Sequence, residues 1–219
     1  MQNTESVSQL SLSKAQEPPA VERVLPHRSF KQGQTASHRP PIDILSAHKY
    51  VSPRSRPLTP EEVEVRRIAY ALKIPTAEAC ELAARDLAPL LDAAEAPGTV
   101  IVLMPVPSST GAVDANRQIA NELAAEVHRR YPDRNVQVKI TVGRKHPVES
   151  SCVRRRRGLA GLRGEQHAMI RVAGPLTATQ TAYYFVDNMA TTGSTLDACR
   201  AALGFGEGIV WADEGRALT

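Results

Sequence analysis

From residue 99 onward, short apolar runs alternate with amphipathic stretches. The continuous apolar run at residues 100–104 has the length of a strand and suits a parallel strand covered on both faces. Residues 115–130 place apolar side chains at spacings of four, which predicts an amphipathic helix. Similar patterns predict strands at 136–142, 169–172, 182–186 and 208–211 and a helix at 194–203. This order indicates an α/β domain over residues 99–219, with a mainly parallel sheet flanked by helices.

A helical segment is predicted at residues 59–98, ahead of this domain. Thr59-Pro60-Glu61-Glu62 has the pattern of a capping box with proline at the first helical position. A second helix is expected from about Ala77, and Pro89 is expected to bend it or end it early. The segment should close at Pro97-Gly98.

Residues 1–58 are expected to form an extended basic arm. They are rich in Ser, Gln, Pro, Arg and His, and they show no sustained helical or strand period. The short apolar stretch at residues 42–45 is suited to anchoring the arm on a surface. A partner protein or a second copy of the chain is the expected means of ordering the rest.

The composition excludes several classes of protein. Hydrophobic residues make up 42% of the chain, which excludes wholesale disorder, and aromatics make up only 4%, which argues against a stacking platform for single-stranded nucleic acid. No apolar run is long enough to span a membrane, and no secretory signal is recognised. The three widely spaced cysteines form neither a metal-ligand set nor a disulfide framework, so the expected location is a reducing cytoplasm.

Positive charge is concentrated in two parts of the chain. Residues 1–60 carry a net charge of +4, and residues 144–171 carry +6. Residues 143–166 also contain several glycines and show little periodicity, so a long mobile loop is expected there, with His146 and His167 facing solvent. Localised positive charge usually faces phosphate, and a solvated basic face is the alternative.

The most informative stretch is residues 184–196, Tyr-Phe-Val-Asp-Asn-Met-Ala-Thr-Thr-Gly-Ser-Thr-Leu. An apolar strand ends in Asp187-Asn188, a loop of small and hydroxyl-bearing residues follows, and a helix begins. Loop N–H groups and a helix N-terminus attract phosphate, while polar side chains at the strand end suit ribose hydroxyls. The alternative is a plain strand-to-helix turn in which Ser194 caps the helix.

These thirteen residues resemble the phosphoribosyl-pyrophosphate (PRPP) signature of type I phosphoribosyltransferases, with one departure. The family's acidic pair, which grips the ribose 2′- and 3′-hydroxyls, appears here as Asp187-Asn188, and the asparagine brings no negative charge. The resemblance implies that the loop binds the ligand's phosphate. The residues this implicates are Ala190, Thr191, Thr192, Gly193, Ser194 and Thr195.

A second stretch is similar to the competence-associated F subfamily of the same enzymes. Residues 103–109, Leu-Met-Pro-Val-Pro-Ser-Ser, are followed by Asn116-x-Gln118 at the start of a helix. In the wider family the loop after the first strand contacts pyrophosphate, which implicates Val106, Pro107, Ser108 and Ser109. The resemblance covers residues 99–213 and places the arginine-rich segment 144–166 where the family has a flexible lid.

The implied reaction is displacement of pyrophosphate from ribose C1 of PRPP by a nitrogen nucleophile, as in nucleotide salvage. Mg²⁺ is expected to bind through the ligand's pyrophosphate and ribose oxygens, with Asp187 as a further ligand. The run Arg154, Arg155, Arg156 and Arg157 has three interpretations: a lid acting on pyrophosphate, a solvated loop, or a contact with nucleic acid backbone. The sequence does not single out one of the four.

A second class of function rests on the same fold. Phosphoribosyltransferase-like subunits accompany reverse transcriptases in bacterial retron defence systems, and a basic arm with an arginine-rich loop suits such an accessory or effector subunit. In that case the protein binds PRPP or ribose 5-phosphate within a nucleic-acid-containing complex rather than serving salvage metabolism.

Overall fold

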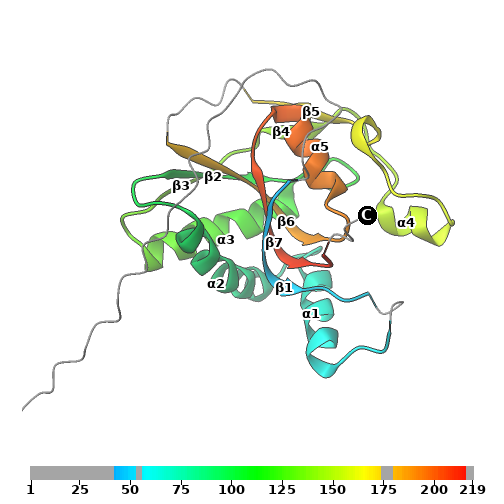
Figure 1. Cartoon of the computed structure of the whole chain (residues 1–219), viewed down its shortest axis with the longest axis horizontal. Helices are drawn as coiled ribbons and strands as arrows, with labels where there is room; N and C mark the ends of the chain where they lie inside the picture. Colours follow the sequence, from blue (N-terminus) through cyan, green and yellow to red (C-terminus); the bar gives the residue numbers. More distant parts are fainter. Residues whose placement is uncertain (1–41, 53–55, 174–179, 216–219) are drawn as a thin grey trace, which may run out of the picture. The chain divides into compact units, whose positions relative to one another are not determined.

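A five-stranded, fully parallel sheet forms the centre of the molecule, with strand order β1-β7-β6-β2-β3 (Figure 1). The computed structural model describes residues 42–52, 56–173 and 180–215. The strands are β1 (Ile44–Lys49), β2 (Val100–Pro105), β3 (Asn135–Val138), β6 (Thr181–Ala190) and β7 (Glu207–Asp213). The prediction of an α/β domain with a mainly parallel sheet is confirmed.

Helices cover both faces of this sheet (Figure 1). The helices are α1 (Pro60–Ala71), α2 (Ala77–Ala94), α3 (Asp114–Arg130), α4 (Ser151–Arg156), α5 (Ser194–Leu203) and the short 3₁₀ helix η1 (Gly164–His167). On one face α1, α2 and α3 pack over a core that includes Leu87, Leu123 and Trp211. On the other face α5 packs over Phe185 and Val210, beside a two-stranded antiparallel sheet of β4 (Val142–Arg144) and β5 (Met169–Arg171).

The strand order creates a crevice between two neighbouring strands. The chain leaves β2 through α3 and arrives at β3 on one side, whereas it leaves β6 through α5 and arrives at β7 on the other. Because β2 and β6 are adjacent and their connections diverge, the loops at their carboxyl ends separate there. Ligands of open α/β sheets bind at such a point.

The arm prediction for residues 1–58 is wrong over its last part. Residues 44–49 form β1, which pairs in parallel with β7 at the edge of the main sheet, and Ile42 and Tyr50 on either side are buried. Gly208 of β7 leaves room for Ile44, since a Cβ at that position would lie 3.1 Å from Ile44 Cγ1. The rest of the predicted arm, residues 1–41 and 53–55, lies outside the described residues.

The predicted capping box of α1 is confirmed, since Thr59 and Glu62 exchange hydrogen bonds. Of the two alternatives expected at Pro89, an early end of α2 is wrong, because the helix continues to Ala94. Pro89 lies on the exposed face, while Leu87 and Leu91 are fully buried. The packing of this buried face outweighs the loss of one helical hydrogen bond.

The predicted long loop at residues 143–166 contains regular structure. Strand β3 ends at Val138 and a separate strand, β4, begins at Val142, so the single strand expected over 136–142 is two. Ser150 then caps α4 by accepting a hydrogen bond from the backbone N–H of Val153, and η1 leads into β5. Local capping and pairing with β5 therefore order a segment that lacks hydrophobic periodicity.

Two further observations concern the described residues alone. None of their helices combines the length and the apolar character needed to cross a bilayer. Cys80 and Cys199 are free, buried thiols, and burial raises the pKa of Cys80 to about 11. Both act as small apolar residues of the core.

Candidate functional site

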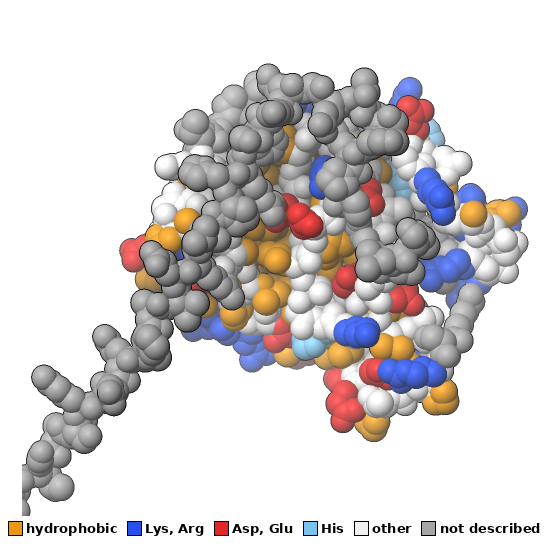
Figure 2. Space-filling view, viewed as in Figure 1, with side chains coloured by type: hydrophobic (Ala, Val, Ile, Leu, Met, Phe, Trp, Pro, Cys, Tyr) orange, Lys and Arg blue, Asp and Glu red, His pale blue; other side chains and the backbone are white. Residues whose placement is uncertain are grey.

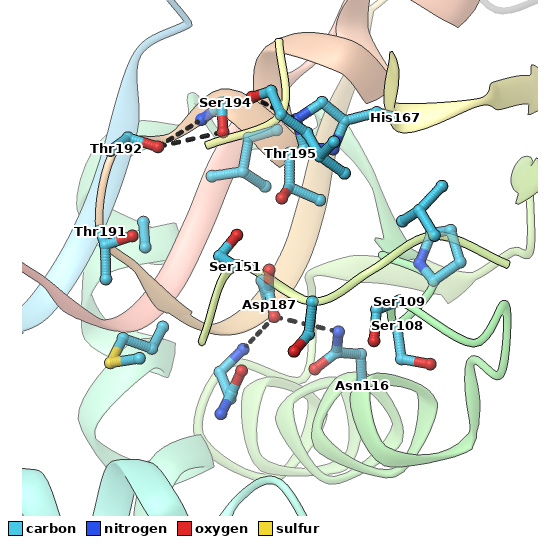
Figure 3. A pocket seen from close by; sticks show the side chains of 18 of the residues that line it. Ser108, Ser109, Asn116, Ser151, His167, Asp187, Thr191, Thr192, Ser194 and Thr195 are labelled. Carbon is cyan, nitrogen blue, oxygen red and sulfur yellow. Dashed lines mark hydrogen bonds between the residues drawn. The ribbon is translucent and has the colours of Figure 1, made fainter. Parts of the chain in front are cut away.

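A pocket of about 430 Å³ opens at the carboxyl ends of β2 and β6 (Figure 3). Its walls come from the loops after these two strands, the first turn of α5, the turn between α1 and α2, and the segment around α4. Twelve residues predicted from sequence line it: Pro107, Ser108, Ser109, Arg155, Asp187, Asn188, Ala190, Thr191, Thr192, Gly193, Ser194 and Thr195. Four do not: Val106, Arg154, Arg156 and Arg157.

Asp187 lies at the floor of the pocket and is held by two donors. The amide Nδ2 of Asn116 lies 3.1 Å from its Oδ1, and the backbone N–H of Asn188 lies 2.8 Å from the same atom (Figure 3). Desolvation by burial raises the pKa of Asp187 to about 6, against the effect of these hydrogen bonds and of the charges on Lys73 and Arg144. At neutral pH the pocket thus holds a carboxylate with few solvent contacts.

Asn188, the second member of the predicted ribose-binding pair, is bonded to a helix. Its Nδ2 donates to the backbone oxygen of Ala69 in α1, at 3.0 Å. Leu72 and Lys73, from the turn after α1, also line the pocket. The helical segment that the resemblance did not reach therefore completes one wall of the site.

The loop after β6 turns sharply into α5. Gly193 is the N-cap of the helix and has φ 69° and ψ 0°, a left-handed conformation that favours glycine. The interpretation of Ser194 as the cap is therefore wrong, since Ser194 is already the first helical residue. Thr192 Oγ1 instead accepts from the backbone N–H of Ser194, at 3.4 Å. The start of α5 thus presents backbone N–H groups and hydroxyls in the pocket wall.

The loop after β2 is held from behind. Val106 is buried, and its N–H donates to the oxygen of Val186 while its oxygen accepts from Asn116 Nδ2 at 2.8 Å. Val106 therefore supports the loop rather than lining the pocket. Arg144, which the sequence marked only as part of a basic segment, donates to the backbone oxygens of Ser108 (2.6 Å) and His167.

Among the four consecutive arginines, Arg155 is the one that lines the pocket. Arg154 and Arg157 instead lie 3.6 and 2.7 Å from the carboxylate of Glu149. Lys and Arg side chains gather over the region of α4 at the right edge of Figure 2. Arg155 therefore faces the pocket, while Arg154 and Arg157 pair with Glu149. Four identical residues in a row give no indication of this difference.

His167 is a pocket residue that sequence reasoning missed. The prediction that it faces solvent is wrong, because only 2% of it is exposed, whereas His146 is exposed as predicted. Its Nε2 lies 3.0 Å from the backbone oxygen of Leu162. Burial lowers the pKa of this imidazole, with the Leu162 oxygen acting in the opposite direction. No sequence motif marks His167, since the η1 turn that buries it is specified by tertiary packing.

The pocket combines three kinds of group suited to a phosphorylated sugar. The α5 end offers donors for an anion, Asp187 offers an acceptor for hydroxyls, and Lys73 and Arg155 supply positive charge. A search against protein-family models finds no match for the chain, and no curated protein sequence matches it either.

Proposed function

We propose that the protein is a phosphoribosyltransferase that binds PRPP with Mg²⁺ and replaces its pyrophosphate with a nitrogen nucleophile. The observation that carries this proposal is the convergence of Asp187, the first turn of α5 and the loop Pro107–Ser109 on one pocket at neighbouring strand ends. The sequence pattern that resembles the PRPP signature lies in the same wall.

Each wall has a role in this proposal. The loop and hydroxyls at Thr191–Thr195 bind the 5′-phosphate, since amide N–H groups and a helix N-terminus favour a doubly charged anion. Asp187 accepts hydrogen bonds from the ribose hydroxyls, and Asn116 keeps its carboxylate oriented. The loop Pro107–Ser109 and Arg155 bind pyrophosphate.

The reaction breaks the bond between ribose C1 and a pyrophosphate oxygen and forms a bond from C1 to nitrogen. The electron pair of the broken bond leaves with pyrophosphate, and the nucleophile's surplus proton is released. The half-buried carboxylate of Asp187 stabilises positive charge that develops on the ring, and Arg155 stabilises the departing anion.

Mg²⁺ fits this pocket as an ion that is bound mainly by the oxygens of PRPP and not by the protein. Within the described ranges, no three potential protein ligands of a metal lie together, so the ion would be held largely by oxygens of PRPP, with Asp187 as a protein ligand. When bound, Mg²⁺ supplies charge neutralisation on the pyrophosphate.

Calorimetry tests the proposal directly. PRPP and ribose 5-phosphate should each bind to the full-length protein, PRPP more tightly when Mg²⁺ is present. Ribose, which lacks the phosphate, should bind far more weakly. Absence of binding by both phosphorylated ligands to folded protein would overturn the proposed function.

A further inference from the structure

His167 carries a ring nitrogen that has nothing to bond to in the described part of the chain. The residue is 98% buried, its Nε2 is engaged by Leu162, and its Nδ1 is a buried atom without a hydrogen-bond partner among the described residues. Figure 3 shows the ring at the α5 end of the pocket, close to Ser194 and Thr195. Helix η1, which carries His167, packs against α5.

The contact with Leu162 determines which nitrogen carries the proton. A backbone oxygen only accepts, so Nε2 must be the N–H and a neutral ring leaves a lone pair on Nδ1. Burial holds the ring neutral in the free protein by lowering its pKa. An unpartnered buried acceptor of this kind is unfavourable, and a bound group that donates a hydrogen to it removes that cost.

The charges around the ring come from four elements. Arg144 of β4 disfavours the charged imidazole, and Asp197 of α5 favours it. Across the pocket lie Arg155 of α4 and Asp187 of β6. Because Asp197 and Arg144 act on the ring in opposite directions, the negative charge of a bound anion can determine whether the His167 imidazole is protonated.

The start of α5 supplies the complementary half of a site. This ten-residue helix begins at Ser194, directly after the left-handed N-cap Gly193, and its first residues lie in the same wall as His167. A helix N-terminus attracts an anion, whereas the lone pair of Nδ1 requires a hydrogen. One chemical class meets both demands, namely a phosphate monoester, which is an anion that titrates near pH 6.

We propose that His167 Nδ1 forms part of the phosphate site at the start of α5 and shares one proton with a bound phosphate monoester. Binding a dianion then takes up one proton from solution, whereas binding a monoanion takes up none. No covalent bond changes in either case. This inference rests on the phosphate loop of the proposed function and assigns to it a residue and a protonation state.

Proton uptake tests the proposal. Ribose 5-phosphate and inorganic phosphate are titrated into the full-length protein at pH 7.5, in buffers of different ionisation enthalpy. We expect uptake approaching one proton per site for ribose 5-phosphate and a smaller uptake for inorganic phosphate, which is partly protonated at this pH. Affinity for ribose 5-phosphate should fall about tenfold for each pH unit above 7. Binding of either ligand without proton uptake would overturn the inference.

Two variants separate His167 from other causes. His167→Gln keeps an amide that can donate to Leu162 and removes Nδ1, so uptake should vanish and affinity at pH 7 should fall about tenfold or more. His146→Gln, an exposed histidine of the same segment, should behave as wild type. A His167→Gln protein that folds and keeps its proton uptake contradicts the inference.

A measurement on the unmodified protein decides the case in which His167→Gln does not fold. The ¹⁵N resonance of His167 Nδ1 should be that of a bare lone pair in the free protein and should move on saturation with phosphate; an unmoved resonance contradicts the inference. Binding of inorganic phosphate with this change, but no binding of PRPP, would refute the proposed function and leave the phosphate site standing. No binding of either ligand would refute both.

Discussion

The Nδ2 atom of Asn116 donates a hydrogen bond to Oδ1 of Asp187, across 3.1 Å and 71 positions of sequence. Asn116 belongs to α3, which follows β2, and Asp187 belongs to β6. The bond therefore joins the connection that follows β2 to the end of β6, the two parts of the chain that diverge at the crevice. Because Asn116 also donates to Val106, it links the carboxylate to the loop after β2.

Replacing Asp187 with asparagine should stabilise the free protein at pH 7.5 but not at pH 4. Burial raises the pKa of Asp187 from its ordinary value of 3.8 to about 6, so the folded state holds this proton more tightly than the unfolded state. Well below pH 3.8 both states are protonated, and at pH 4 only a small part of the difference has developed. As pH rises to 6, wild type loses stability, on the order of 2–3 kcal/mol, that Asp187→Asn retains.

Urea unfolding of both proteins at the two pH values measures this difference. The variant should also bind ribose 5-phosphate more weakly at pH 7.5, since the carboxylate is gone. If the two proteins were equally stable at both pH values, ionisation of the Asp187 carboxyl group would not destabilise the folded protein.

Asn188→Asp would give residues 187–188 the acidic pair of the phosphoribosyltransferase signature, and we expect this change to weaken the fold. The Asn188 amide donates to the Ala69 oxygen, and a carboxylate cannot, so two acceptors would face each other. The cost should be about 1–3 kcal/mol at pH 7.5 and should shrink near pH 4, where a protonated carboxyl can donate. Asn121→Asp, on the exposed face of α3, is the matched control in urea unfolding. Equal effects of the two changes would argue against the Ala69 bond.

Arg155→Ser should weaken binding of Mg²⁺-pyrophosphate about tenfold or more, whereas Arg156→Ser should change it less than about threefold. The two variants lose the same charge from the same helix, but Arg155 alone of the pair lines the pocket. A charge-assisted hydrogen bond accounts for the larger effect, and long-range attraction accounts for the smaller one. Competition calorimetry compares the two variants. Equal losses of affinity would show that α4 acts only through its overall positive charge and not through a contact of Arg155.

Asp86→Ala should destabilise the edge of the sheet by about 1–3 kcal/mol. One carboxylate oxygen of Asp86 lies 2.9 Å from His48 Nε2 and 2.9 Å from Trp211 Nε1, so it joins α2 to β1 and β7. Alanine would leave the indole N–H of the buried Trp211 without its acceptor. Asp86→Asn keeps an oxygen there and should cost less. Urea unfolding followed by Trp211 fluorescence measures both, and an Asp86→Ala protein as stable as wild type would contradict the expectation.

Short-range patterns determined the elements that carry the site. The helix predicted at 194–203 is α5, and the apolar run at 100–104 lies within β2. Both follow from local rules, since a hydrophobic period and a glycine turn act over a few residues. The lining of the pocket by Asp187 and Thr191–Thr195 was predicted for the same reason, because parallel strands place the loops after them at one edge of the sheet.

Only the tertiary structure decided which polar groups meet. Strand β1 joins the sheet through residues 44–49 because β7 offers it an edge, not because of any period in the preceding residues. Arg155 rather than Arg156 lines the pocket because of where the folded chain places α4, and His167 is buried where η1 packs against α5. Burial and hydrogen-bond partners depend on contacts between distant segments, so residues of one type in a row acquire different roles only when the chain folds.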